Sequence, residues 1–115
     1  MIVKYQCTNI SSKNPKALAE FYRNIGAPVY VADDRYDGWQ LGNENEAYIC
    51  VWDENKWGKS TAGYVTFVFK VDDLQKTYEE LIGKGIEAEP PKTASWGGQE
   101  LVLEDPEGNR IILLR

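Results

Sequence analysis

The side chains that most often carry catalysis are scarce in this chain of 115 residues, which contains no histidine. Without histidine, a serine or cysteine nucleophile lacks its usual general base. No glycine-rich loop of either common phosphate-binding type is present. Lysines and carboxylates are numerous, but on the predicted helices they lie mostly opposite the apolar side chains and indicate a solvated surface. The sequence therefore predicts no catalytic residue and favours a protein that is not an enzyme.

Two cysteines, Cys7 and Cys50, remain as candidates for chemistry. If they face one cavity, the two thiols could bind a soft metal or respond to oxidation. The alternative, which we favour, is two small buried residues in strands, where free cysteine is common. Two cysteines are too few for a disulfide framework, and the N-terminus has no signal-peptide pattern. We therefore expect reduced thiols and a cytoplasmic location.

Charge and composition limit the partners of this chain. The formal net charge is −5, and 43% of the residues are hydrophobic, as in ordinary globular proteins. A nucleic-acid partner requires a basic face, and an anionic membrane surface also repels an acidic protein. No apolar run approaches the roughly 20 residues that cross a bilayer. We expect neither nucleic acid nor a membrane as a partner.

The elements that position the candidate residues occur twice in the same order. Helices are predicted from Asn14 to Gly26 and from Asp73 to Gly85, and their first residues lie 59 positions apart. Each helix begins at a capping side chain and ends at a glycine. Turns are predicted at 42–45 and 105–108. The predicted strands cover residues 2–10, 28–32, 37–41 and 47–52 in the first half, and residues 64–71, 86–89, 98–104 and 109–114 in the second.

This repeat predicts an α+β fold of two tandem βαβββ modules in a single domain, residues 1–115. Module one covers about residues 1–53, a polar linker about 54–62, and module two about 63–115. One helix covers only one face of a four-stranded sheet, so each sheet keeps a second face. We expect these faces to form a curved mixed sheet around a cavity, a common kind of ligand site.

Three stretches resemble the vicinal-oxygen-chelate superfamily, which includes glyoxalase I, bleomycin-resistance proteins and extradiol dioxygenases. Residues 14–23 (NPKALAEFYR) resemble its first helix, "D-P-x-x-L-A-x-F-Y-R". Residues 71–74 (VDDL), followed by 83–86 (GKGI), resemble its second helix. Residues 105–111 (DPEGNRI) resemble its last turn, "D-P-x-G-N-x-I-E-L". The match covers the whole chain in the expected order.

Enzymes of this superfamily bind a divalent metal through four side chains, two in each half, usually His, Glu or Gln. The resemblance places these four positions at Cys7, Cys50, Thr66 and Ile112, and the position of Cys50 is set by the turn to within one or two residues. Isoleucine cannot bind a metal, and threonine is a poor zinc ligand. We therefore expect no metal and no other cofactor, as in the bleomycin-resistance-like branch.

Aromatic residues are the most abundant remaining candidates, with four tryptophans and seven tyrosines. Aromatic walls suit flat or cationic ligands, although each of these rings could instead fill the core or a dimer interface. Trp96 is the best single candidate, because its glycine-flanked loop offers little core to fill. By strand alternation, the predicted ligand-binding residues are Tyr5, Cys7, Trp39, Tyr48, Cys50, Trp52, Tyr64, Thr66, Trp96, Arg110 and Ile112.

These observations favour a non-catalytic small-molecule-binding protein that sequesters its ligand, with a cationic or aromatic drug as that ligand. The resemblance implies a homodimer with ligand pockets at or near the subunit interface. The alternative is a metal-dependent lyase, isomerase or dioxygenase of the same fold with an altered ligand set. A third alternative is a regulatory module without a ligand.

Overall fold

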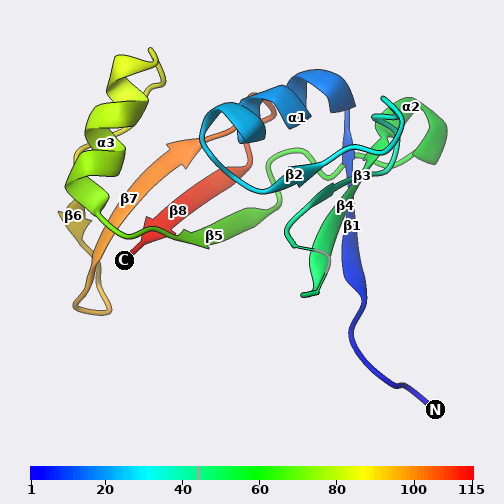
Figure 1. Ribbon diagram of the computed structural model, residues 1–115, viewed down its shortest axis with the longest axis horizontal. Coiled ribbons are helices and arrows are strands. Elements are labelled where there is room, and N and C mark those ends of the chain that lie inside the picture. The colour runs from blue at the N-terminus through cyan, green and yellow to red at the C-terminus, as the bar shows by residue number, and fades with distance from the viewer. Residues whose placement is uncertain (44) are drawn as a thin grey trace. The chain divides into compact units, whose positions relative to one another are not determined.

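The chain forms two compact units, each built on one four-stranded sheet, in a computed structural model that describes residues 1–43 and 45–115 (Figure 1). Unit 1, Met1–Ala62, contains β1 (Cys7–Ser12), α1 (Pro15–Asn24), β2 (Val29–Tyr30), β3 (Trp39–Leu41), β4 (Tyr48–Asp53) and the short α2 (Glu54–Trp57). Unit 2, Gly63–Arg115, contains β5 (Thr66–Lys70), α3 (Leu74–Gly83), β6 (Lys92–Thr93), β7 (Gln99–Glu104) and β8 (Arg110–Leu114).

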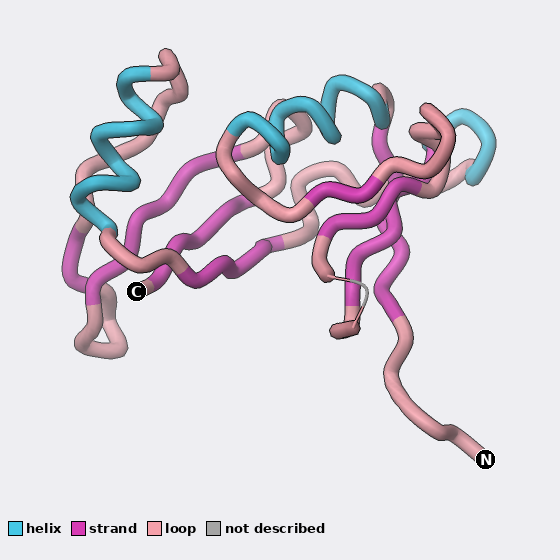
Figure 2. Tube along the Cα trace, viewed as in Figure 1, coloured by secondary structure: helices cyan, strands magenta, loops and turns pink. Residues whose placement is uncertain are grey.

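The two sheets have the same topology. Their strand orders are β1-β4-β3-β2 and β5-β8-β7-β6. In each sheet the first strand pairs in parallel with the last, and the other neighbours are antiparallel. In both units one strand precedes the long helix and three strands follow it, as predicted (Figure 2). The α+β class and the repeated βαβββ arrangement are therefore confirmed.

The two long helices begin at the residues that the sequence predicts. The Oδ1 atom of Asn14 accepts a hydrogen bond from the Ala17 amide at 3.1 Å, and Oδ1 of Asp73 accepts one from the Lys76 amide at 2.9 Å. These caps satisfy donors that have no partner inside the helix. The helices α1 and α3 have ten residues each. In the described part of the chain, no helix is long and apolar enough to cross a membrane.

Each sheet buries the face that its long helix covers. In unit 1, Tyr22 of α1 packs against Trp39 of β3, with ring centroids 6.3 Å apart. Burial of each large apolar side chain in such a core contributes roughly 1.5–3 kcal/mol to stability. The buried strand residues that share these faces are Ile10, Trp39, Leu41 and Val51 in unit 1, and Phe67, Leu101, Leu103, Ile111 and Leu113 in unit 2.

Two strand predictions are wrong, each for a local reason. The first strand begins at Cys7 rather than at residue 2, because its partner β4 begins at Tyr48, which lies opposite Cys7. Residues 86–89 form no strand, and the short β6 follows only at Lys92–Thr93. Two prolines at 90–91 lie between them, and proline lacks the amide that a strand ladder uses.

The segment predicted as a linker contains ordered structure. Asp53 caps α2 by accepting a hydrogen bond from the Asn55 amide at 3.0 Å, and Gly58 ends the helix at a φ of +78°. The turn predicted at 42–45 includes residue 44, which lies outside the described residues.

Hydrogen bonds hold the end of unit 1 and the start of unit 2 to their own sheets. Thr61 and Ser11 exchange bonds: the Ser11 amide donates to Thr61 Oγ1 at 3.0 Å, and the Thr61 amide donates to Ser11 Oγ at 3.1 Å. The Gly63 amide donates to Oδ1 of Asn109 at 3.0 Å, and Nδ2 of Asn109 donates to Oδ2 of Asp105 at 2.9 Å. Asp105 and Asn109 are both buried. The "D-P-x-G-N" turn is thus a structural anchor.

Replacement of Asn109 by alanine leaves both the Gly63 amide and the buried Asp105 carboxylate short of one hydrogen bond. Gly63 is exposed, so water can replace its lost bond, whereas the buried Asp105 carboxylate keeps the bonds from the Glu107 and Asn109 amides and loses one charge-assisted bond. Since such a bond contributes about 1.5–3 kcal/mol, we expect Asn109→Ala to lower the free energy of unfolding by about 2 kcal/mol in urea titrations. Asn55→Ala, at an exposed position of α2, is the control and should change it by less than about 0.5 kcal/mol. Equal effects of the two substitutions would contradict the anchoring role.

Candidate functional site

The face of the unit 1 sheet that lies opposite α1 carries four of the eleven residues predicted for the site. Register sets this face, because residues directly opposite one another on paired strands point to the same side. Asn9 pairs with Cys50, and Cys50 in turn pairs with Gln40. The face opposite α1 therefore holds Cys7, Asn9, Ser11, Tyr30, Gln40, Tyr48, Cys50 and Trp52.

The two cysteines are diagonal neighbours on this face, and both are free thiols. Cys7 Sγ lies 3.7 Å from Oδ1 of Asn9, whereas Cys50 Sγ lies 3.5 Å from the Gly38 carbonyl oxygen. Burial raises the pKa of Cys50 from 9.0 to about 11, with smaller contributions from Cys7 and from the Asp37 carboxylate. Cys50 is therefore a neutral thiol at physiological pH, with little nucleophilic or metal-binding character.

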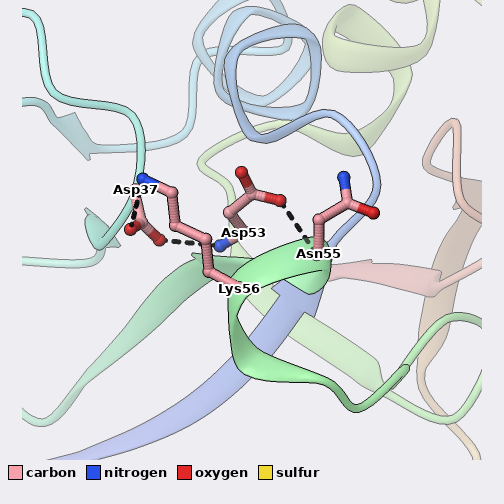
Figure 3. A network of polar contacts seen from close by, with 4 residues as sticks. All are labelled: Asp37, Asp53, Asn55 and Lys56. Carbon is pink, nitrogen blue, oxygen red and sulfur yellow. Dashed lines mark hydrogen bonds and ion pairs between the residues drawn. The ribbon is translucent and has the colours of Figure 1, made fainter.

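Asp37 fixes the chain that enters β3 (Figure 3). Its Oδ1 accepts a hydrogen bond from the Asp53 amide at 2.8 Å, and its Oδ2 lies 3.5 Å from Nζ of Lys56. The Lys56 side chain is 71% exposed, so this ion pair is weak. The network ties the end of β4 and the start of α2 to the edge of the candidate site.

Trp52 rests directly on Gly38 of the same loop. A Cβ atom added at Gly38 would lie 2.9 Å from Cζ3 of Trp52, and Gly38 has a φ of +97°. Only glycine fits this position, both for space and for backbone conformation. The Nε1–H group of Trp52 is buried and has no hydrogen-bond partner among the described residues. An unsatisfied buried donor of this kind costs about 1–3 kcal/mol.

Unit 2 repeats this geometry with different side chains. Thr66 pairs with Arg110, and Val68 pairs with Ile112, so these four residues share the face opposite α3. In the parallel strand pair of unit 1, Cys50 lies opposite Asn9. In the corresponding pair of unit 2, Ile112 lies opposite Val68, so Cys50 and Ile112 occupy equivalent positions. Thr66, Val68 and Arg110 are exposed, and Ile112 is half-buried.

Four residues predicted for the site lie apart from these sheet faces. Trp39 points to the opposite side, is 1% exposed and packs on Tyr22. Trp96 lies in the turn between β6 and β7, beside the start of α3. Tyr5 and Tyr64 precede their strands and are 63% and 89% exposed.

Four residues on the face opposite α1 were not predicted for the site: Asn9, Ser11, Tyr30 and Gln40. Gln40 and Tyr30 share it with Cys50 through the antiparallel pairing of β2, β3 and β4. Strand alternation already indicates that Gln40 and Trp39 point to opposite faces. The sequence alone does not tell which of the two residues points to the site, because the register of β3 against β4 decides that.

The chain belongs to the family described as the Glyoxalase/Bleomycin resistance protein/Dioxygenase superfamily, whose model matches residues 5–113. A solved bleomycin-binding protein complexed with bleomycin is similar, with 20% identity, a TM-score of 0.70, and coverage of 99% of this chain and 98% of that one. TnmS3, an antibiotic-binding protein from Streptomyces, has 19% identity, a TM-score of 0.74 and coverage of 98% and 95%. Lactoylglutathione lyase from Agrobacterium tumefaciens has 16% identity, a TM-score of 0.73 and coverage of 98% and 93%.

At these identities the solved structures establish the fold that this chain shares with binding proteins and with an enzyme. Comparison with curated protein sequences gives no match.

The residues at the four metal positions of the superfamily do not fit a metal. Unit 1 offers Cys7 and Cys50, and the raised pKa of Cys50 opposes the thiolate that a metal requires. Unit 2 offers Thr66 and Ile112, of which isoleucine has no donor atom. Among the described residues, no group of three or more His, Cys, Asp or Glu side chains is arranged to hold an ion. We therefore derive no chemical step through a metal.

The raised pKa of Cys50 predicts slow alkylation. At pH 8 the thiolate fraction should be about a hundredfold lower than at the ordinary pKa, because two pH units separate the values. We expect the iodoacetamide reaction at Cys50, followed by peptide mass spectrometry, to accelerate about tenfold per pH unit up to pH 10. The urea-unfolded chain is the control, and its Cys50 should react as an ordinary thiol. An ordinary rate in the folded chain at pH 8 would contradict the burial argument.

Proposed function

We propose that this chain is a non-catalytic protein that binds and sequesters a cationic or aromatic small molecule. The main support for the proposal is the chemistry of the four positions that the resemblance assigns to a metal. They hold the protonated thiol of Cys50, a second thiol, one hydroxyl group and the hydrocarbon side chain of Ile112. These side chains suit contact with an organic ligand better than coordination of an ion. Similarity to a bleomycin-binding protein and to an antibiotic-binding protein supports the same class of function.

The ligand-contact surface that we propose in unit 1 is the face opposite α1. Trp52 and Tyr48 supply aromatic rings there, and rings of this kind attract flat cations. Asp37 adds a carboxylate beside the Gly38 backbone on which Trp52 rests, and the net charge of −5 favours cations over anions.

In unit 2 we propose the face opposite α3 as the corresponding contact surface, with Thr66, Arg110 and Ile112. We further propose that the protein acts as a homodimer in the cytoplasm. The superfamily resemblance supports the dimer, and the free thiols of Cys7 and Cys50 are consistent with a reducing compartment.

Calorimetric titration with bleomycin, proflavine and ethidium tests the binding proposal. We expect saturable binding of at least one of these cations, weakened about tenfold by Trp52→Phe through the loss of aromatic ring area. Trp57→Phe is the matched control, because Trp57 lies on α2 and is 38% exposed, and it should leave affinity unchanged within about twofold. Thermal melting of each variant shows that it is folded. Absence of binding across the panel would overturn the proposal.

Elemental analysis separates the proposal from a metal-dependent lyase, isomerase or dioxygenase. The protein should be purified without chelators and compared with a lactoylglutathione lyase prepared in parallel. We expect less than about 0.1 equivalent of iron, manganese, nickel or zinc, because the four positions supply no carboxylate or imidazole. One equivalent of any of these metals would favour the enzyme.

A further inference from the structure

A cleft lies in unit 2 at the start of α3, apart from the sheet face that carries Thr66 and Ile112. Its volume is about 580 Å³, within the usual range for small-molecule sites. Gln99, which lines the cleft, stands two positions before the buried Leu101 in β7, so both point to the side of the sheet that α3 covers. The cleft therefore lies on the opposite side of the sheet from Thr66 and Ile112.

Trp96 forms one wall of this cleft and is held in place although it is 61% exposed. The Ala94 amide donates to the Gly98 carbonyl oxygen at 2.7 Å, and the Gly97 amide donates to the Ala94 carbonyl oxygen at 3.0 Å. The Trp96 ring lies over Gly98, in the space that a Cβ atom there would need. One face of the indole is thus fixed by contact with glycine, and an exposed aromatic surface remains for a ligand.

The charges of the cleft favour a cation. Asp72 and Asp73 contribute two carboxylates, against the single guanidinium of Arg115. Asp73 is engaged as the N-cap of α3, whereas Asp72 is exposed and does not cap the helix. A cation above the Trp96 ring would gain both the attraction of the aromatic face and that of the Asp72 carboxylate.

Gln75 adds a directed hydrogen-bond acceptor. Its Nε2 donates to Oε1 of Glu79, one helical turn later, at 3.3 Å. This bond orients the amide group and leaves its Oε1 atom able to accept an N–H from a molecule in the cleft. Aromatic face, carboxylate and amide oxygen together match a planar cation that carries N–H groups.

We propose that the Trp96 cleft is a separate binding site for planar organic cations of the amidinium or guanidinium class. The cation stacks on Trp96, its charge faces Asp72, and its N–H groups donate to Gln75. This site does not depend on the proposed function of the two sheet faces, because it lies on the helix-covered side of unit 2.

Titration with benzamidinium chloride, followed by the indole N–H signals in ¹H–¹⁵N NMR spectra, tests the proposal. We expect saturable shifts of the Trp96 signal, identified by its absence in Trp96→Phe, and no shift of the Trp57 signal. Neutral benzamide, which has the same shape, should bind at least about fivefold more weakly, because it lacks the charge. Equal shifts with benzamide, or no saturable shift of Trp96, would overturn the proposal.

Single-charge variants test the assigned electrostatics. Asp72→Asn should weaken benzamidinium binding about threefold, and Arg115→Gln should strengthen it about twofold, the size expected of exposed charge pairs. Glu104→Gln is the matched control, because Glu104 shares the other sheet face with Arg110, and it should have no effect. Unchanged affinity in Asp72→Asn would refute the assignment.

Trp96→Ala distinguishes this site from the proposed function. We expect it to abolish the benzamidinium response at the Gln75 side-chain amide while calorimetric drug binding, where present, is retained. Loss of both in a folded variant would mean that the two proposals describe one site and would overturn the claim of a separate one.

Discussion

The parallel pairing of one early and one late strand in each unit is the constraint on which the candidate site depends. It places Cys50 beside Asn9 and Ile112 beside Val68, although about 40 residues separate the partners in each pair. A single helix then covers one face of each sheet and buries its apolar residues there. The residues that alternate with that core point to the opposite face, and they include the four positions that the superfamily resemblance assigns to a metal. The same strands therefore supply the core from one face and the candidate site from the other.

Burial next to the core explains why the Cys50 thiol has a raised pKa and low nucleophilicity. Its neighbour Val51 is fully buried against α1, and Trp52 rests on the Gly38 backbone whose carbonyl oxygen lies near Cys50 Sγ. A thiolate there would lose hydration and face the Asp37 carboxylate, so the thiol keeps its proton. A histidine or glutamate at this position could act as a ligand, whereas a buried neutral thiol behaves as a small apolar surface.

The fold could be predicted from sequence because its signals are local. Asn14 and Asp73 cap helices of equal length, and such caps depend only on residues within one turn. The positions of Cys7, Thr66 and Ile112 were predicted from the superfamily resemblance, because β1 and β8 show no strict alternation of polar and apolar residues. Trp39 was harder to place, because β3 has only three residues and its register against β4 sets the face. The sequence shows prolines at 90–91 and glycines at 97–98 around Trp96, which indicate turns. Turn residues do not tell which distant segment lies beside them, so the position of Trp96 next to α3 could not be predicted.

Both exposed or half-exposed tryptophans proposed for binding rest on a glycine, Trp52 on Gly38 and Trp96 on Gly98. A free tryptophan side chain samples several rotamers, and fixing it on binding costs free energy. Contact with a backbone that lacks Cβ restricts each ring whether or not a ligand is present. The two glycines therefore reduce the conformational freedom that each tryptophan would lose on binding a ligand.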